Sequence, residues 1–483
     1  MRAKLIGSTK HLFFALFYAT SGVVITALVA IVWLLNARPE LSVWHKLDLQ
    51  HQYQGQKQIR SFNDYLALED KLFDELQSEI YQRYQPSVSS PINRYETGSL
   101  SDPNQWQNNW NRSFEWPKKD AEYGVLLLHG MSDSPYAMRH LAQSFDDNAA
   151  VLGLRLPGHG TIPSALTRLR WKDMAKAVKL ATEHMQQRLQ GRPLYVIGFS
   201  TGAALALNHE LEQIHQGHAP AYDKMVFISP AIGLPTIAAG AYWQAKLGEV
   251  LGLEKLAWNS IKVEYDPFKY LSFAVNAGDV VYSLTNRNEY LMAQFNDEQL
   301  GQIPSILTFQ SVVDDTVSTP AVLSRLFYYL PSLQHELVLF DVNRSRLKNS
   351  LMKTEPLAQL ASLGMDTDKR FHVSLIENMS QSSNQVQSRT VIDQGAETII
   401  SPLALEWPSD VYSLSHVALP FPEYDPLYGP HEDPDYQGVH IGQAIFQGER
   451  GIFNVEASDM LRQKWNPFYP YMESRIHNFI TAK

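Results

Sequence analysis

LYVIGFSTG at residues 194–202, followed directly by AALALNHELEQI at 203–214, decides the fold. An apolar run at Leu194–Gly198 leads through a G-x-S-x-G motif into a helix-like segment, which is the context that this motif needs. A serine at such a tight turn points outward at the carboxyl edge of a sheet, and the flanking glycines relieve clashes there. The N-terminus of the next helix favours developing negative charge. The context predicts Ser200 as a nucleophile, with an ordinary tight turn as the alternative.

Short apolar runs on both sides of this motif predict further strands. Runs of this kind suit a parallel sheet that is covered on both faces, and strands that alternate with helices imply right-handed crossovers. The sequence therefore predicts an α/β protein with a doubly wound, mostly parallel sheet. The expected strands are Tyr123–Leu128, Ala149–Leu154, Leu194–Gly198, Lys224–Ser229, Ser305–Gln310 and His335–Val342, with a helix over Trp171–Leu189.

Several segments lie outside this alternation. Residues 61–84 carry apolar side chains at helical spacing, and residues 97–117 look like an irregular arm that wraps the domain. Residues 231–300 contain a helical, aromatic-bearing segment. Residues 343–405 are rich in Ser, Gln and Asn.

Composition excludes several classes of function. The chain has 483 residues, 45% of them hydrophobic, which is typical of a folded globular protein. The net charge of −9 comes from dispersed residues without a basic stripe, which argues against nucleic acid as a partner. The absence of cysteine excludes a cysteine nucleophile, a thiolate metal site and any disulfide.

The N-terminus predicts a membrane anchor. Residues 12–35 carry no charge and would span roughly 36 Å as a helix, longer than the apolar part of a signal peptide, which is the alternative. Arg2, Lys4 and Lys10 precede this stretch, so we expect a cytoplasmic N-terminal tail. The remainder would lie outside the cytoplasm, in the periplasm of a bacterium with two membranes. The expected divisions are a tail at 1–11, an anchor at 12–35, a juxtamembrane helix and arm at 36–118, and the main domain at 119–483.

His129-Gly130-Met131, directly after the strand GVLLL, forms a second element. Gly130 lets the backbone turn, so that the amide of Met131 can point to the same place as the amide of Thr201. Two such donors would bind the oxyanion of a tetrahedral intermediate, and each is typically worth about 2.7 to 4 kcal/mol. We expect His129 to hold the turn and not to carry a proton.

Five separated motifs resemble the α/β-hydrolase superfamily. They are LLHGMSDSP from Leu127, LRLPGHG at 154–160, GFSTG at 198–202, SVVDDTV at 311–317 and SLSHVALP at 413–420. The most similar group contains monoacylglycerol lipases, lysophospholipases and proline-iminopeptidase-like serine hydrolases. The resemblance covers about residues 120–342 and resumes near 410. It implies the α/β-hydrolase fold, hydrolysis at a carbonyl, and a serine, acid and histidine in that order.

By this resemblance the catalytic acid falls in the loop at 311–317. The usual family arrangement has Val three positions after the aspartate, which selects Asp314, with Asp315 as the fallback. Ser311 stands where the family often has Gly, which leaves the choice between the two open. The alternative role for either carboxylate is to cap the segment STPAVLSRLFYYL.

The resemblance places the catalytic base at His416. The other histidines that could serve are His372, His431, His440 and His477. His159 in Pro-Gly-His-Gly is expected to be a structural loop residue. An insertion at 343–405, which the group generally lacks, separates the acid from the base and has no assigned role.

The implied chemistry is nucleophilic catalysis without a metal or an organic cofactor. His416 would accept the proton of Ser200, Asp314 would fix the tautomer, and an acyl-enzyme would form and be hydrolysed. Residues 231–300 lie where the superfamily inserts a lid, and their aromatic content suits an acyl chain. An acyl ester or lysolipid is thus the expected substrate. A peptide bond is the second expectation, and a non-catalytic binding or scaffold domain the third.

Overall fold

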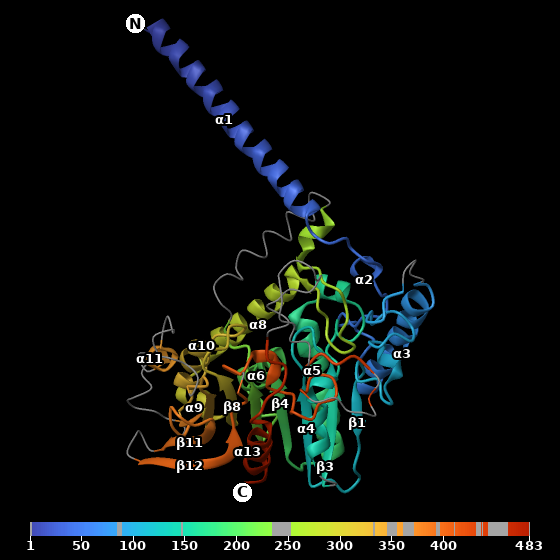
Figure 1. Cartoon of the computed structure of the whole chain (residues 1–483), viewed down its shortest axis with the longest axis vertical. Coiled ribbons are helices and arrows are strands. Elements are labelled where there is room, and N and C mark those ends of the chain that lie inside the picture. The colour runs from blue at the N-terminus through green and yellow to red at the C-terminus, as the bar shows by residue number, and fades with distance from the viewer. Residues whose placement is uncertain are drawn as a thin grey trace.

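A central sheet with helices on both faces forms the body of the protein, and a long helix extends from it (Figure 1). The computed structural model describes residues 2–84, 89–145, 148–233, 253–331, 334–344, 355–360, 371–392, 397–409, 411–430, 436, 438–442 and 462–482.

Ten strands of the described residues make one sheet in the order β1-β3-β2-β4-β5-β8-β9-β10-β11-β12. Neighbours from β3 to β10 run parallel, whereas β1, β11 and β12 are antiparallel additions at the two edges. The prediction of a mostly parallel α/β sheet is therefore confirmed. The strands are β1 Phe114–Trp116, β2 Tyr123–Leu128, β3 Ala149–Leu154, β4 Leu194–Phe199, β5 Lys224–Ile228, β8 Ser305–Ser311, β9 Glu336–Phe340, β10 His372–Asn378, β11 Gln385–Ile392 and β12 Glu397–Glu406.

The structure differs from the sequence prediction at both edges of the sheet. The arm at 97–117 is expected to be irregular, but Phe114–Trp116 pairs with β3 as strand β1. The predicted insertion at 343–405 supplies β10, β11 and β12, and β10 continues the parallel sheet from β9. The predicted helix over 61–84 is α3, Phe62–Leu76, continued by a π-helical turn at Gln77–Tyr81.

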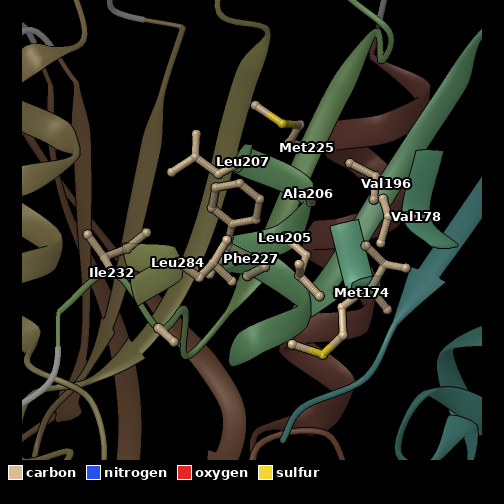
Figure 2. Packing of buried hydrophobic residues seen from close by; sticks show 14 of the residues in the cluster. Met174, Val178, Val196, Leu205, Ala206, Leu207, Met225, Phe227, Ile232 and Leu284 are labelled. Atoms are coloured by element: carbon tan, nitrogen blue, oxygen red, sulfur yellow. The ribbon is translucent and has the colours of Figure 1, made fainter. Parts of the chain in front are cut away.

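Two layers of helices bury alternate side chains of the sheet. On one face, Val196 of β4 packs with α5 (Trp171–Leu189), α6 (Thr201–His215) and α8 (Val275–Gln294). Figure 2 shows part of this cluster between the strands and α6. Ile197 points to the other face, toward α4 (Arg139–Ser144) and α13 (Tyr469–Thr481). Because each fully buried aliphatic or aromatic side chain contributes about 1.5–3 kcal/mol, both faces hold the strand ends in place.

Shorter elements connect these layers. The remaining helices are α2 Val43–Lys46, α9 Asp297–Gly301, α10 Thr319–Arg325 and α11 Pro356–Leu360, with 3-10 turns at Pro103–Gln105, Pro135–Met138, Pro163–Thr167, Glu254–Ala257, Phe327–Tyr329 and His416–Ala418. A separate pair of strands, β6 Trp258–Ser260 and β7 Phe273–Ala274, is antiparallel.

Helix α1, Arg2–Asn36, contacts solvent along its apolar part (Figure 1). Its segment Phe13–Ile31 has a mean hydropathy of 2.1 and is 0% buried, so its length and composition suit a membrane span; a signal sequence has the same features. The chain that follows docks on residues 253–274, here called the strap. Arg38 donates to the Trp258 carbonyl oxygen at 2.7 Å, and Lys255 donates to the Arg38 carbonyl oxygen at 3.2 Å.

Arg94 and the arm at 97–117 also hold the strap. The backbone amide of Arg94 donates to the Glu264 carbonyl oxygen at 2.9 Å, and the Arg94 guanidinium donates to the Lys269 carbonyl oxygen at 3.2 Å. Asn111 donates to the Pro267 carbonyl oxygen at 3.0 Å. The strap is the part of the predicted lid at 231–300 that follows residues 231–233 in the described structure, and it is tied to the body from two sides. Residues 234–252 of that prediction lie outside the described residues.

A buried ionic cluster joins α4 to the chain before α13. The Asp425 carboxylate accepts hydrogen bonds from Tyr136 at 3.1 Å, Arg139 at 3.2 Å and His140 at 2.8 Å, and from two backbone amides of its own turn. Burial raises the pKa of this carboxyl, but the hydrogen bond from His140 and the charge of Arg139 outweigh burial and lower the pKa to about 2.

Replacing Asp425 with alanine is expected to lower the free energy of unfolding by about 3–5 kcal/mol, because Arg139 is left buried without its counterion. Chemical denaturation of the full chain in detergent measures this loss. Since the folded pKa lies below the ordinary value of 3.8, the carboxylate stabilises the fold above pH 3.8 and loses this effect as pH falls toward 2. The difference between parent and variant should shrink over that interval. Asp315→Ala, at an exposed carboxylate, is the control and should change stability by less than about 0.5 kcal/mol.

Candidate active site

Ser200 occupies a strained turn between β4 and α6. Its φ of 53° and ψ of −114° are unusual for a residue with a side chain, and such backbone strain typically costs about 1–3 kcal/mol. Two hydrogen bonds hold the turn: the Ser200 amide donates to the Ile228 carbonyl oxygen at 2.9 Å, and its carbonyl oxygen accepts from Ala231 at 3.1 Å. The end of β5 thus fixes the position of the candidate nucleophile.

Two glycines allow α6 to begin this close to the sheet. A Cβ atom at Gly198 would lie 2.4 Å from the Ala203 amide nitrogen, and one at Gly202 would lie 2.2 Å from the Leu128 carbonyl oxygen. No side chain fits at either position. The contact at Gly202 brings the start of α6, with Thr201, against the chain that leaves β2 toward Met131. The two segments that carry the predicted oxyanion donors therefore meet.

His129 holds the loop after β2, as predicted. Its Nδ1 lies 2.8 Å from the Gly130 carbonyl oxygen, and its Nε2 accepts from the Leu156 amide at 3.0 Å. Burial holds the pKa of His129 well below its ordinary value, which keeps the ring neutral and able to accept. His159, whose ring centroid lies 5.1 Å away, is also buried, and burial lowers its pKa to about 4. The His129 ring joins two loops, whereas His159 Nδ1 lies 2.9 Å from the Pro157 carbonyl oxygen of its own loop, and both rings lack the basicity of a proton carrier at neutral pH.

Asp314 and His416 lie together although 102 positions separate them. The distance from His416 Nδ1 to Asp314 Oδ2 is 2.9 Å, and the two side chains are 5% and 0% exposed. The backbone amides of Thr316 and Val317 donate to the other carboxylate oxygen at 2.9 and 3.1 Å. Burial raises the pKa of Asp314, but the His416 imidazole and these amides outweigh burial and bring the pKa below its ordinary value. The carboxylate is ionised at neutral pH.

Asp315 has a different environment. Its side chain is 84% exposed and pairs with Arg462 at 3.0 Å. Neither carboxylate caps α10, because the hydroxyl of Ser318 accepts the hydrogen bond from the Ala321 amide. The alternative role as a helix cap is therefore wrong for both aspartates. Of the two, Asp314 is the one that reaches His416.

His416 also contacts the residue that precedes the predicted nucleophile. Its ring centroid is 5.1 Å from that of Phe199, the residue before Ser200. The other histidines that sequence analysis considered lie elsewhere: His372 begins β10, and His477 in α13 contacts Ser144 Oγ at 2.9 Å. The ring of His440 packs on Tyr436 with centroids 5.1 Å apart. His431 lies outside the described residues.

Gln310 is a site residue that sequence analysis missed. Its amide donates to Asp314 Oδ2 at 3.1 Å and to the Thr319 hydroxyl at 3.1 Å. It is buried at the end of β8, one position before Ser311. A long polar side chain near the end of a buried strand was the available signal, because a buried amide requires a partner. Within the part of the chain that the structure describes, no group of three or more His, Asp or Glu side chains could hold a metal ion.

A cavity of about 230 Å³ lies beside this site. Val417, which follows His416, lines it together with Ser132, which follows Met131. Tyr270 of the strap also lines the cavity. Its backbone amide donates to the Ser132 carbonyl oxygen at 2.8 Å, which fixes the strap to the loop that carries Ser132. The lining thus includes the residue that follows the candidate base and the residue that follows the candidate oxyanion donor.

Comparison with known proteins agrees with this arrangement. Residues 119–325 match the Hydrolase_4 family, described as serine aminopeptidase, S33. A thermostable monoacylglycerol lipase of Bacillus sp. (strain H-257) is 34% identical over 123 residues, which are 25% of this chain and 46% of that lipase. The match therefore spans less than half of the lipase.

Solved structures are similar to the chain at lower sequence identity. A metagenome-derived lipolytic enzyme is 20% identical with a TM-score of 0.37, over 53% of this chain and 96% of the other. The monoacylglycerol lipase of Paleococcus ferrophilus is 16% identical with a TM-score of 0.34, over 47% and 88%.

The parallel sheet, the turn at Ser200 and the family match together make residues 119–325 an α/β-hydrolase region. These residues are similar to the serine-aminopeptidase-like family, and part of the chain is similar to a monoacylglycerol lipase.

Proposed function

We propose that the protein is a membrane-anchored serine hydrolase that cleaves a carboxylic ester with a lipid-like acyl group. The hydrogen bond between Asp314 and His416, beside the residue that precedes the strained Ser200, is the observation that carries this proposal. A carboxylate, an imidazole and a serine hydroxyl in this order form the working unit of serine hydrolases.

The geometry suggests a role for each residue. Asp314 accepts the Nδ1 proton of His416, so that Nε2 is free to accept the proton of Ser200 as its oxygen attacks the carbonyl carbon. The amides of Met131 and Thr201 stabilise the oxyanion that forms. His416 then returns the proton to the leaving alcohol, and water hydrolyses the acyl-enzyme by the same path in reverse.

The orientation of the sheet supports a substrate from a membrane. Lys224, at the start of β5, donates to the Ala482 carbonyl oxygen at 2.6 Å, so the amino ends of the parallel strands lie by the C-terminus. Helix α1 leaves from the opposite end of the body (Figure 1). The carboxyl ends, with Ser200, therefore face the side of the anchor. A bilayer around α1 would lie near the site.

A panel of substrates tests the reaction. The full chain in non-ionic detergent should release p-nitrophenol from p-nitrophenyl butyrate and oleate from monooleoylglycerol faster than p-nitroaniline from a prolyl anilide. The family description as a serine aminopeptidase favours a peptide bond as the second candidate, which faster release of p-nitroaniline would establish. Absence of turnover together with no labelling by a fluorophosphonate would indicate a binding or scaffold domain.

A C-terminal fusion is expected to show that the hydrolase domain lies outside the cytoplasm, because Arg2, Lys4 and Lys10 favour a cytoplasmic tail. Alkaline phosphatase at the C-terminus should be active, since it folds only outside the reducing cytoplasm, and β-galactosidase at the same place should be inactive. Retention in membranes after an alkaline carbonate wash distinguishes an anchor from a cleaved signal. The reverse pattern of fusion activities would contradict the proposed topology.

A further inference from the structure

Gln310 contacts the Asp314 carboxylate from the end of β8. Its side-chain nitrogen, Nε2, lies 3.1 Å from Asp314 Oδ2 and 3.1 Å from the Thr319 hydroxyl oxygen. The Thr319 hydroxyl donates its own proton to the Ser311 carbonyl oxygen at 2.9 Å, so its oxygen is left to accept. An ionised carboxylate also only accepts. Because both neighbours of the amide need a donor, the hydrogen-bond network itself fixes the amide with its nitrogen toward them.

The Asp314 carboxylate receives two hydrogen bonds on each oxygen. Oδ1 accepts from the backbone amides of Thr316 and Val317 at 2.9 and 3.1 Å. Oδ2 accepts from His416 Nδ1 at 2.9 Å and from Gln310. Gln310 and His416 therefore share one oxygen. Since a donor stabilises the negative charge of its acceptor, the hydrogen bond from Gln310 reduces the charge that Oδ2 offers to His416.

Packing does not explain an amide at this position. Gln310 is 0% exposed, and its carbonyl oxygen, Oε1, makes no hydrogen bond with the described residues. A buried polar atom without a partner is destabilising, so stability alone would favour an apolar side chain here. The donor that Gln310 provides to the Asp314 carboxylate is the feature that an apolar side chain would lack.

We propose that Gln310 is a positioning residue that sets the strength of the bond between Asp314 and His416, and thereby the pH above which the hydrolase is active. The inference rests on the proposed function and deepens it, because it concerns the same three residues. With Gln310 in place, Oδ2 holds the imidazolium form of His416 less strongly, so the ring gives its proton to the leaving alcohol more readily. Gln310 acts through Asp314, since its own side chain is fully buried.

Charged residues on other segments also act on His416. Asp315 pairs with Arg462 at 3.0 Å, and its side chain is 84% exposed. The charged residues that line the cavity together with Val417, the residue after His416, are Lys262, Asp266, Lys269, Arg462 and Lys464. All of these groups are the same when Gln310 is replaced, so their effects on His416 cancel in a comparison of the parent with a Gln310 variant.

Replacing Gln310 with methionine, which has a similar length and no donor, is expected to raise the acidic midpoint of the kcat/KM profile by about 0.5–1 pH unit. Oδ2 would then hold the imidazolium form more strongly, so a higher pH is needed to obtain the neutral His416 that accepts the proton of Ser200. Profiles of p-nitrophenyl butyrate hydrolysis by the full chain in non-ionic detergent measure this change. The melting temperature of each variant is measured alongside.

Thr308→Val is the matched control. Thr308 also lies in β8 and, two positions before Gln310, on the same face of the strand. It is 0% exposed, and its hydroxyl makes no hydrogen bond with the described residues. Valine has nearly the same shape, so this variant alters a buried polar group of the same strand without touching Asp314. It should leave the midpoint unchanged.

Gln310→Asn provides a second variant in case the methionine side chain disturbs folding. It keeps the amide but is one methylene shorter, so its nitrogen cannot reach Asp314 and Thr319 together, and the midpoint should rise by a smaller amount. An unchanged midpoint with a lower plateau in the folded variants would reduce Gln310 to a support of the loop and overturn the inference, while the hydrolase function stands. Unfolding of both variants would likewise assign it a structural role. A parent protein that neither hydrolyses the ester nor reacts with a fluorophosphonate removes the proposed function as well.

Discussion

Replacing Ser200 with alanine is expected to reduce kcat on p-nitrophenyl butyrate by roughly 10⁶-fold, the size of loss seen when a serine hydrolase loses its nucleophile. The physical reason is that no other group is positioned by the strained turn at φ 53° to attack the carbonyl carbon. Initial rates with purified full chain measure the loss. A fluorophosphonate should label the parent protein and leave the variant unlabelled.

Stability must be measured alongside activity, because the variant also changes the backbone preference at a residue with positive φ. Gln190→Ala is the matched control: Gln190 also has positive φ, at 52°, and lies at the end of α5, away from the site. A Ser200→Ala variant that hydrolyses the ester as fast as the parent would remove the proposed nucleophile. Loss of activity in both variants with equal loss of folding would assign Ser200 a structural role.

The parallel part of the sheet was predictable because its strands are continuous apolar runs. Ala149–Leu154 and the helix Trp171–Leu189 have the predicted bounds, since both faces of the strand and one face of the helix are buried. The edges were not predictable in the same way. Strands at an open edge have a solvated face, so β11 and β12 mix polar with apolar residues and resemble a loop in sequence. The three residues of β1 are too few to show a period.

The candidate site was also predictable from the sequence only in part. A local motif predicts Ser200 as the nucleophile. The order of motifs in the family predicts Asp314 as the acid and His416 as the base, and in the structure Asp314 Oδ2 and His416 Nδ1 lie 2.9 Å apart. Part of the cavity lining comes from two segments about 200 positions apart, near Lys262 and Arg462, and neither segment has a motif. Their meeting depends on how the strap and the chain before α13 pack on the body. That packing is set by tertiary contacts, such as the hydrogen bonds from Arg94 to the strap, and not by local spacing.

Replacing Asp314 with asparagine is expected to lower kcat on the same ester by roughly 10⁴-fold, while the fold remains intact. The carboxylate of the parent accepts the Nδ1 proton of His416, whereas the asparagine amide can donate to Nδ1 and stabilise the opposite tautomer. Nε2 would then carry a proton and could not accept one from Ser200. Steady-state kinetics and slower labelling by the fluorophosphonate measure this effect.

The pH dependence of the rate distinguishes the role of Asp314 in fixing the His416 tautomer from the simple loss of a negative charge. Because the pKa of Asp314 lies below its ordinary value of 3.8, its protonation affects the parent only in strong acid, and the carboxylate is present throughout the neutral range. The rate of Asp314→Asn should therefore stay low across that range. It should rise at high pH, where attack by hydroxide partly replaces the base. Asp315→Asn provides the control, because its exposed carboxylate does not reach His416 and its removal should change kcat less than about twofold. A larger loss in Asp315→Asn than in Asp314→Asn would transfer the role of the acid to Asp315 and contradict the geometry of the site.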